Sequence, residues 1–403
     1  MLKVLVADKF ETVGVDGLKD LGCEVVLRAE GKAEELPAVL REVDPKILVV
    51  RSKKVNETAL SAGPGLLLVI RAGAGIDNID VAAASRLGIF VANCPGRNSI
   101  AVAELTMALL LALDRRIPDQ VTDLRRGEWR KGEYARARGL YGRTLGILGL
   151  GQIGREVARR AQAFGMNVVA WSRNITLEDA RRLRIGYCEA PIEVARLSDA
   201  VSVNLAAAEE TTGLVNAEFL AALKPGAYFI NTSRGSVVDE AALARAVRER
   251  GIRAGLDVYQ AEPGASKAEF RPEIVSLPGV YGTHHVGAST DQAQLAIAHE
   301  VIRIVAGFMS TGVALHCVNR LARSSATHVL SVRHRNRPGV LAHVFRVLFD
   351  GRVNVEEVEN IAYHGAQAAL ARIHLATRPS DEALAAIRNG NGDVISVELT
   401  TVK

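Results

Sequence analysis

One glycine-rich stretch, residues 144–158, constrains the fold of this chain more than any other part of the sequence. Its apolar start, residues 144–148, is followed by Gly149, Gly151 and Gly154 and then by an amphipathic segment. In this G-x-G-x-x-G spacing the first glycine permits a tight turn, the second lets the backbone approach a pyrophosphate, and the third allows close helix packing. The helix N-terminus then faces the anion. The pattern predicts a dinucleotide-binding strand, turn and helix rather than a purely structural turn.

Apolar strands and amphipathic helices alternate over residues 1–320. We expect strands at residues 3–7, 24–27, 47–50, 66–70, 89–92, 167–171, 200–205, 228–231 and 254–258, and helices at 15–21, 34–43, 100–113, 240–250 and 292–308. Strands that alternate with helices of this length form parallel sheets with helices on both faces. The sequence therefore predicts an α/β fold with doubly wound, Rossmann-like sheets.

A polar linker at 319–326 separates a C-terminal unit from this pattern. In that unit the order is strand, helix, strand, strand, helix, strand, at residues 327–333, 339–349, 354–362, 366–375, 381–388 and 393–401. This βαββαβ order is the ferredoxin-like plan. We therefore expect a separate, ferredoxin-like unit at the end of the chain.

Two local features around residue 100 carry structural predictions. Ser99 is a typical N-cap residue, and the helix expected behind it is apolar nearly all round, which indicates burial in the core or in a subunit interface. After Pro118 the sequence becomes polar and irregular as far as Gly142. We expect no regular element in that segment.

Composition narrows the classes of function open to this chain. Of its 403 residues, 48% are hydrophobic and 24% are charged, and the net charge of +5 comes from basic residues interspersed with acidic ones. No basic tail or aromatic-interleaved basic patch is present, which excludes nucleic acid as an expected partner. No apolar run reaches membrane-spanning length, and the first residues resemble a strand rather than a signal peptide. With four cysteines and no C-x-x-C pair, we expect free thiols and a cytoplasmic location.

The residues after the second strand of the nucleotide fold bear on the choice of cofactor. At this point NAD-binding sites normally carry an acidic residue for the ribose 2′-hydroxyl, whereas here Ser172, Arg173 and Asn174 follow the strand. Arg173 could bind a 2′-phosphate through charge-assisted hydrogen bonds. The alternative is that Ser172 binds the ribose hydroxyls and Arg173 stacks on adenine. Either NAD(H) or NADP(H) is expected, and the missing carboxylate favours NADP(H).

Three polar clusters follow strands in the second half of the nucleotide fold, and they hold Arg234, Glu262 and His285. This trio suits hydride transfer between a carbon atom and nicotinamide. The planar guanidinium of the arginine can bind a 2-oxo carboxylate through two hydrogen bonds. The histidine accepts the hydroxyl proton, and the glutamate orients the imidazole and raises its pKa, so that it is protonated when it must donate. Any one of them alone is more simply explained as a structural ion pair or cap, and their joint occurrence after the glycine motif indicates catalysis.

The chain resembles the D-isomer-specific 2-hydroxyacid dehydrogenases along essentially its whole length. The matching stretches are 71–80, 93–113, the glycine motif, 231–241, 255–263 and 282–294. The resemblance implies that Arg234, Glu262 and His285 are catalytic, with His285 rather than the adjacent His284 as acid/base. It implies cofactor contacts at Gly149, Gly151, Gln152, Ile153, Gly154, Ser172, Arg173, Thr232, Ser233, Arg234, Asp257, His285 and Gly287. It also implies a discontinuous, flavodoxin-like substrate domain of residues 1–97 and 287–320, a nucleotide domain of 98–286, and a regulatory domain of 325–403.

Within that family the chain most resembles the members that oxidise 3-phospho-D-glycerate. The resemblance implies substrate contacts at Arg51, Ser52, Lys53, Gly73, Ala74 and Arg234. The C-terminal unit resembles an ACT domain, which implies L-serine as a possible effector bound by His334, Asn336 and Asn354. No metal site is expected, and the implied assembly is a homodimer or homotetramer.

Two other functions stay open from the sequence. One is an NADPH-dependent reductase of glyoxylate or hydroxypyruvate, which the missing ribose carboxylate favours. The other is a dinucleotide-sensing binding protein of the corepressor type, and the intact catalytic trio argues against it.

Overall fold

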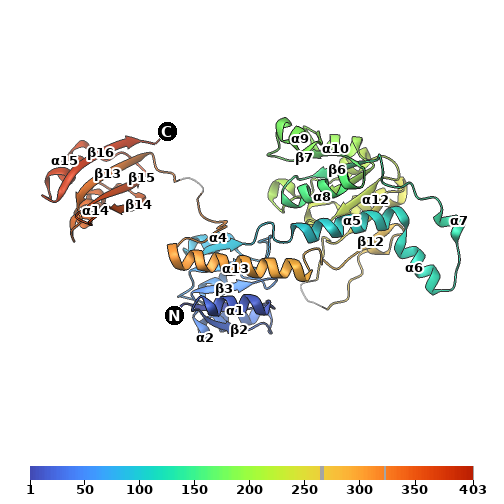
Figure 1. The fold of residues 1–403 in the computed structure, drawn as a ribbon, viewed down its shortest axis with the longest axis horizontal. Coiled ribbons are helices and arrows are strands. Elements are labelled where there is room, and N and C mark those ends of the chain that lie inside the picture. Colours follow the sequence, from blue (N-terminus) through green and yellow to red (C-terminus); the bar gives the residue numbers. More distant parts are fainter. Residues whose placement is uncertain (264–266, 322–323, 403) are drawn as a thin grey trace. The chain divides into compact units, whose positions relative to one another are not determined.

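The computed structural model describes residues 1–263, 267–321 and 324–402. The chain separates into two compact units, Met1–Asn319 and Arg320–Lys403. The first unit contains two parallel sheets and the second a single antiparallel sheet (Figure 1). The predicted α/β class with parallel, Rossmann-like sheets is confirmed.

The first sheet has five parallel strands in the order β2-β1-β3-β4-β5. Its strands are β1 (Lys3–Val6), β2 (Glu24–Leu27), β3 (Ile47–Val50), β4 (Leu68–Arg71) and β5 (Phe90–Asn93). Its helices are α1 (Thr12–Asp20), η1 (Ala33–Glu35), α2 (Leu36–Val43), α3 (Glu57–Ser61), α4 (Val81–Arg86) and, from much later in the chain, α13 (Asp291–Thr311). The central strand β3 is apolar and buried along its whole length because helices cover both faces of the sheet.

The second sheet has seven parallel strands in the order β12-β11-β10-β9-β6-β7-β8. Its strands are β6 (Thr144–Leu148), β7 (Asn167–Trp171), β8 (Gly186–Tyr187), β9 (Ala200–Val203), β10 (Tyr228–Asn231), β11 (Arg253–Leu256) and β12 (Val280–Gly282). The helical segments around it are α5 (Ser99–Arg115), α8 (Gln152–Ala163), α9 (Leu177–Leu183), α10 (Pro191–Leu197), η2 (Glu209–Thr211), α11 (Ala217–Ala222), η3 (Gly235–Val237), α12 (Glu240–Arg250) and η4 (Glu273–Ser276). The strand order reverses between β6 and β9, which in doubly wound sheets is where ligands bind.

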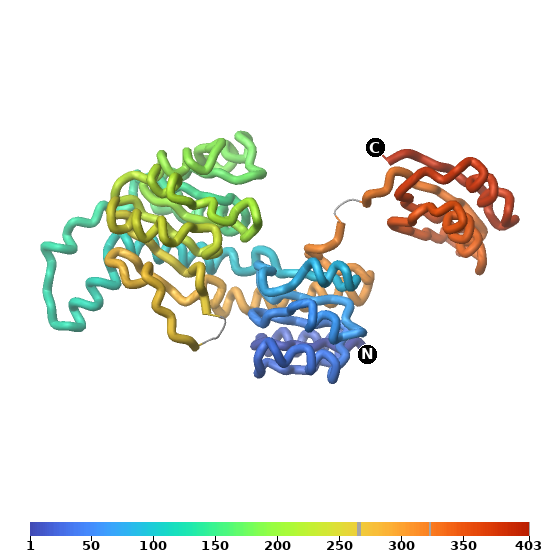
Figure 2. Tube along the Cα trace, turned by 180° about the vertical axis from the view of Figure 1, so that it is seen from behind, coloured from blue at the N-terminus to red at the C-terminus, as the bar shows by residue number. Residues whose placement is uncertain are grey.

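Two local predictions near residue 100 were wrong. Ser99 is the first helical residue of α5, and Asn98 stands at the N-cap without a side-chain capping bond. The segment after Pro118 is not irregular, because it forms α6 (Ile117–Arg125) and α7 (Lys131–Tyr134). Pro118 lies in the first turn of α6, where its missing N–H costs nothing. Both helices lie on an arm that extends away from the seven-stranded sheet (Figures 1 and 2).

Helix α13 connects the later part of the chain back to the first sheet. It is the one helix of the described residues that is long and apolar enough, by length and composition, to cross a membrane. Its apolar residues Ile297, Val301 and Ile304 are instead buried against the five-stranded sheet, in one cluster with Val4. The apolar character of α13 therefore reflects core packing.

The chain leaves the first unit along strand β5. Asn319 Oδ1 accepts a hydrogen bond from the main-chain N–H of Val91 at 2.8 Å, and its Nδ2 donates to the carbonyl of Ile89 at 2.8 Å. Ala92 and Cys317 form an isolated antiparallel bridge just before it. The predicted linker follows, and its residues Ala322 and Arg323 lie outside the described residues.

The second unit folds as a four-stranded antiparallel sheet with two helices. Its elements are β13 (His328–Arg335), α14 (Val340–Asp350), β14 (Val355–Ala362), β15 (Ala368–Leu375), α15 (Asp381–Asn389) and β16 (Val394–Thr401), and the strand order is β14-β15-β13-β16. Leu330, Val344, Ile373 and Ile387 meet in its own buried core. The βαββαβ order agrees with the ferredoxin-like plan.

Candidate active site

The glycine turn after β6 forms a cradle at the N-terminus of α8. Gly149 has φ +91°, and a Cβ there would lie 2.7 Å from the carbonyl oxygen of Asn204, so only glycine fits. A Cβ on Gly151 would meet no atom within 4 Å, which leaves space in front of the helix N-terminus. Asn204 Oδ1 is buried and has no hydrogen-bond partner within the described ranges. The turn therefore has the shape and the open helix N-terminus that a pyrophosphate requires.

The residues expected to meet the ribose lie at the end of β7. Arg173 has a side chain that is 77% exposed, and its Nη1 lies 4.0 Å from Oε1 of Glu210. Glu210 belongs to η2, on the loop after β9. At this separation the carboxylate competes only weakly for the guanidinium, which is open to a ligand in solvent.

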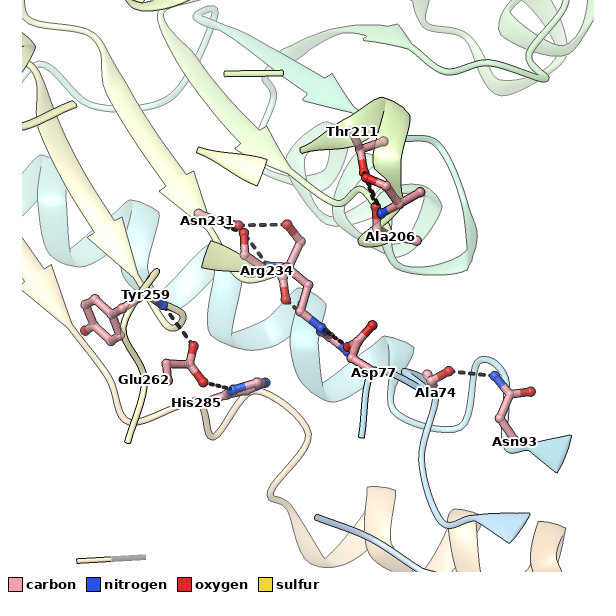
Figure 3. A network of polar contacts seen from close by, with 12 residues as sticks. Ala74, Asp77, Asn93, Ala206, Thr211, Asn231, Arg234, Tyr259, Glu262 and His285 are labelled. Carbon is pink, nitrogen blue, oxygen red and sulfur yellow. Dashed lines mark hydrogen bonds and ion pairs between the residues drawn. The ribbon is translucent and has the colours of Figure 1, made fainter. Parts of the chain in front are cut away.

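The three predicted catalytic residues lie on three loops at the carboxyl edge of the seven-stranded sheet, where His285 contacts Glu262 and Arg234 separately contacts Asp77 (Figure 3). His285 Nδ1 is 2.7 Å from Glu262 Oε2, and Glu262 Oε1 accepts a hydrogen bond from the main-chain N–H of Tyr259 at 2.8 Å. Burial raises the pKa of the Glu262 carboxyl, but the bonds from His285 and Tyr259 and the charge of Arg234 outweigh it, so the pKa lies below its usual value. Glu262 is therefore ionised and fixes the imidazole.

The loop that carries His285 is held by Asp257. This carboxylate is almost fully buried and accepts hydrogen bonds from the Thr283 hydroxyl at 2.6 Å and from the main-chain N–H groups of Val286 and Gly287 at 2.9 Å. The bonds bracket His285, whose φ is +52°, a left-handed conformation uncommon for a residue with a side chain. Asp257, which we expected at the cofactor, thus orients the loop of the predicted acid/base residue.

Two predicted cofactor residues, Thr232 and Ser233, follow directly after β10 and are held there by hydrogen bonds. Thr232 Oγ1 lies 2.9 Å from Thr106 Oγ1 on α5. The hydroxyl of Ser233 donates to Asn231 Oδ1 at 2.8 Å, and Nδ2 of Asn231 donates to the carbonyl of Arg234 at 3.0 Å. These bonds fix the main chain that presents Arg234.

Arg234 meets the glycine-rich loop that follows β4. Its Nε lies 2.6 Å from Asp77 Oδ2, and its Nη1 donates to the carbonyl of Ser233 at 2.7 Å (Figure 3). The guanidinium passes so close to Gly75 that a Cβ there would clash with it. Ala74 accepts a hydrogen bond from Asn93 Nδ2 at 2.6 Å through its carbonyl. The loop that was expected to bind substrate therefore reaches Arg234, the predicted catalytic arginine.

Arg71 is a functional candidate that the sequence did not single out. Its guanidinium packs over Gly73 so closely that a Cβ there would collide with it, and its Nε is buried with no hydrogen-bond partner among the residues described. Burial, followed by the positive charges of Arg234 and Arg51, lowers the pKa of Arg71 to about 10. The guanidiniums of Arg51, Arg71 and Arg234 therefore share one region in which Asp77 is the carboxylate that pairs with Arg234, and the excess of positive charge suits an anionic ligand. The signal in the sequence was the position of Arg71 at the end of a strand.

The loop of Arg51, Ser52 and Lys53 borders the same region. Arg51 Nη2 lies 3.4 Å from the hydroxyl of Ser289, just after the His285 loop. The carbonyl of Lys53 accepts a hydrogen bond from Asn78 Nδ2 at 2.8 Å. The guanidinium of Arg51 is therefore brought toward the segment that follows His285, while Lys53 is fixed through its main chain.

The three residues expected to bind an effector lie in the second unit. His334 is buried, with Nδ1 2.8 Å from the carbonyl of Arg335 and Nε2 3.1 Å from Asn360 Oδ1. Asn336 Nδ2 donates to the carbonyl of Ala366 at 3.1 Å, and Asn354 Nδ2 donates to Glu356 at 2.9 Å. All three side chains have internal partners, and effector binding stays a prediction.

Comparisons with known proteins identify relatives of this chain. The family model described as D-isomer specific 2-hydroxyacid dehydrogenase, NAD binding domain, matches residues 107–287. The chain is 37% identical over 319 residues to a D-3-phosphoglycerate dehydrogenase of Methanocaldococcus jannaschii, covering 78% of this chain and 59% of that protein. It is 40% identical over 271 residues to a hydroxypyruvate reductase of Thermotoga maritima, covering 67% of this chain and 86% of that protein.

A solved structure also resembles the first unit. It is an NADPH-dependent glyoxylate/hydroxypyruvate reductase from Sinorhizobium meliloti in complex with NADP and malonate, with a TM-score of 0.68 and 32% identity over 80% of this chain and 99% of that one. The chain spans about three fifths of the length of the phosphoglycerate dehydrogenase that it matches. On these findings the chain belongs to the D-isomer specific 2-hydroxyacid dehydrogenase family, and residues 107–287 match that family's NAD-binding domain.

Proposed function

We propose that this chain oxidises 3-phospho-D-glycerate to 3-phosphohydroxypyruvate, the first step of L-serine synthesis. The observation that carries this proposal is the convergence of Arg51, Arg71 and Arg234 beside the His285–Glu262 pair. A phosphorylated 2-hydroxy acid has an anion at each end. Arg234 suits the carboxylate, and the two other guanidiniums suit the phosphate. The likeness to a D-3-phosphoglycerate dehydrogenase supports the same substrate.

The residues have distinct roles in this reaction. Arg234 binds the carboxylate and the 2-oxygen of the substrate. Because Nδ1 of His285 is directed at the ionised Glu262, Nε2 is left to accept the hydroxyl proton. A bound nicotinamide dinucleotide provides the acceptor for the hydride from C2. Glu262 stabilises the imidazolium that forms, and in the reverse direction His285 returns the proton to the 2-oxygen.

We further propose NADP(H) as the preferred cofactor, because Arg173 stands where a ribose carboxylate would repel the 2′-phosphate. Residues 1–97 and 287–320 would bind substrate, and 98–286 would bind nucleotide. Residues 325–403 would form an ACT domain that binds L-serine, in a homodimer or homotetramer. The four cysteines are free, in keeping with a reducing, cytoplasmic location.

A matrix of substrates and cofactors tests the proposal on the purified chain. It pairs 3-phosphoglycerate with NAD⁺ and NADP⁺, and 3-phosphohydroxypyruvate, hydroxypyruvate and glyoxylate with NADH and NADPH, each with and without L-serine. We expect turnover to be selective for the phosphorylated pair and to be lowered by serine. Equal or better turnover of the unphosphorylated acids would overturn the substrate assignment, and indifference to serine would overturn the effector assignment alone.

A second candidate function is an NADPH-dependent reductase of hydroxypyruvate or glyoxylate. The specific observation that favours it is Ser172–Arg173 in place of an acidic residue, together with the likeness to a hydroxypyruvate reductase over most of that protein. Under this function Arg51 and Arg71 would not discriminate between substrates. The same matrix separates the two functions through the ratio of kcat/KM for 3-phosphohydroxypyruvate and hydroxypyruvate.

A further inference from the structure

Three successive main-chain amides after β3 converge on one carboxylate. Asp8 Oδ2 accepts hydrogen bonds from the N–H groups of Arg51 at 2.7 Å, Ser52 at 3.1 Å and Lys53 at 3.0 Å. Asp8 Oδ1 accepts a fourth bond from the hydroxyl of Ser52 at 3.3 Å. Consecutive amides in such a concave arrangement form an anion-binding nest. Here the chain fills the nest with its own carboxylate.

The position of Asp8 follows from the sheet. Strand β1 pairs directly with β3, and the N–H of Ala7 donates to the carbonyl of Val49 at 2.9 Å. Asp8 is the next residue after this bond, so it leaves the sheet beside the loop that begins at Arg51. A carboxylate placed by a buried strand is a firmer anchor for a loop than a side chain from another loop.

The anchored loop borders the proposed phosphate site. The charge of Arg51 reaches Arg71 strongly enough to lower the pKa of that guanidinium, and Arg51 Nη2 lies 3.4 Å from Ser289 Oγ. The direction of the Arg51 side chain therefore depends on the main chain that Asp8 holds.

We propose that Asp8 is a positioning residue that sets the selectivity for a phosphorylated substrate. It occupies the amide nest, so the substrate phosphate is bound by arginine side chains and not by the main chain. It also fixes the conformation from which Arg51 reaches that phosphate. This inference rests on the proposed function, since it concerns how the same site recognises the phosphate group.

The Asp8 carboxylate can either position Arg51 or compete with the substrate phosphate for the amides of the nest. Replacing Asp8 changes phosphate binding in opposite directions in these two cases. If Asp8 positions Arg51, Asp8→Ala loosens the loop and phosphate binding weakens. If Asp8 only competes with the substrate, Asp8→Ala empties the nest and phosphate binding strengthens. The sign of the change in KM for 3-phosphohydroxypyruvate therefore decides between them.

The experiment compares KM and kcat for 3-phosphohydroxypyruvate and hydroxypyruvate, which differ only in the phosphate. We expect Asp8→Ala to raise KM for the phosphorylated acid by roughly 10- to 100-fold, as small misplacements of binding groups do, with KM for hydroxypyruvate and both kcat values little changed. Asp8→Asn keeps one acceptor oxygen and should restore part of the loss. Asp44→Asn is the matched control, because Asp44 holds a loop at the other end of β3 through a 2.9 Å bond from the N–H of Gly65.

A double variant checks that Asp8 acts through Arg51. Arg51→Ala alone should raise KM for 3-phosphohydroxypyruvate, and adding Asp8→Ala should then have almost no further effect. An unchanged or lowered KM in Asp8→Ala, or full additivity of the two changes, overturns the inference while the wild-type preference for the phosphorylated acid still stands. A wild-type enzyme without that preference overturns the proposed function, and the inference with it. Melting temperatures of all variants separate a loop effect from loss of folding.

Discussion

The two parallel sheets of the first unit both present polar groups at the carboxyl ends of their strands, but they fix these groups differently. In the seven-stranded sheet, short acidic side chains bond the main chain: Asp257 holds the loop of His285, and Glu262 is held by an N–H of its own turn. In the five-stranded sheet the presented groups are the long side chains Arg51 and Arg71, whose positive charges oppose each other. A carboxylate also holds the main chain of the Arg51 loop, since Asp8 accepts hydrogen bonds from its amides. The difference therefore lies in the presented side chains, which are short and hydrogen-bonded in the His285–Glu262 pair and long and mutually repelling in Arg51 and Arg71.

This difference shows how related proteins of one fold could keep the same reaction and bind different substrates. A group locked by main-chain bonds loses little freedom when it reacts, which suits proton transfer at a fixed position. Long arginines lose more side-chain entropy on binding, but they adapt to anions of different size. We therefore expect substitutions in the hydrogen-bonded His285–Glu262 pair to change kcat, and substitutions of long, exposed arginines in either sheet to change KM.

The largest effect is expected for His285→Asn, which tests the rigid side of this comparison. Loss of the acid/base group should lower kcat by roughly 10²- to 10⁴-fold, and cofactor affinity, to which His285 is also expected to contribute, should fall much less. Asparagine is suitable because it tolerates the left-handed backbone of residue 285, whose φ is +52°. Steady-state kinetics and a cofactor titration measure both quantities. A rate near that of the wild type would remove His285 from the mechanism.

An intermediate effect is expected for Glu300→Gln, which tests how the five-stranded sheet is held. Glu300 on α13 is almost fully buried and pairs with Arg97, with Arg303 and with His316. Because both arginine side chains are about half exposed and can be rehydrated, we expect a loss of about 2 kcal/mol in the free energy of unfolding. Denaturant unfolding followed by circular dichroism measures the loss. An unchanged stability would show that the ion pairs add nothing to the packing of α13.

The same carboxylate predicts a dependence of stability on pH. Burial raises the pKa of Glu300, but hydrogen bonds from Arg303 and Arg97 outweigh it and hold the pKa below its usual value. Since the pKa is lower in the folded state than in the unfolded state, the contribution is full above the usual glutamate pKa and is lost as the pH falls through the folded pKa. The difference in stability between wild type and Glu300→Gln should therefore shrink on acidification. A difference that is constant from neutral to acidic pH would contradict this.

The smallest effect is expected for Arg173→Ser at the ribose end of the seven-stranded sheet. Because Arg173 is exposed, its interaction with a 2′-phosphate is screened and should contribute only about 1 kcal/mol, or roughly 5-fold in the ratio of KM for NADPH and NADH. Arg182→Ser is the matched control, since Arg182 is an exposed arginine on helix α9 that pairs with Asp179. If both variants shift the ratio equally, Arg173 has no special role in cofactor choice.

The sequence predicted the parts of the molecule that depend on local requirements. The glycine turn was predictable because Gly149 and Gly154 sit where a Cβ would clash. The βα alternation was predictable because buried parallel strands are apolar on both faces. Helix α6 was missed because it is short and polar and has a proline as its second residue, and the start of α5 was misplaced because Asn98 and Ser99 are both typical capping residues.

The substrate side was less predictable because its roles arise only in three dimensions. Arg71 ends a strand like many other residues, and its importance comes from the approach of two arginines that lie far from it in the sequence. Asp8 likewise gains its role from the pairing of β1 with β3, which sets its carboxylate against the amides of a loop more than forty residues later. Contacts between residues so far apart in the chain leave no characteristic spacing in the sequence from which they could be predicted.

The hydrogen bonds of Asn319 have a consequence for where this chain can be cut. Strand β5 is an edge of its sheet, and edge strands expose main-chain groups that recruit strands of other molecules. Asn319 and the bridge at Cys317 occupy those groups at Ile89, Val91 and Ala92. A fragment that ends after Asn319 keeps this edge covered, whereas one that ends before Cys317 leaves it open to aggregation. The last residues of the first unit therefore protect the sheet from self-association.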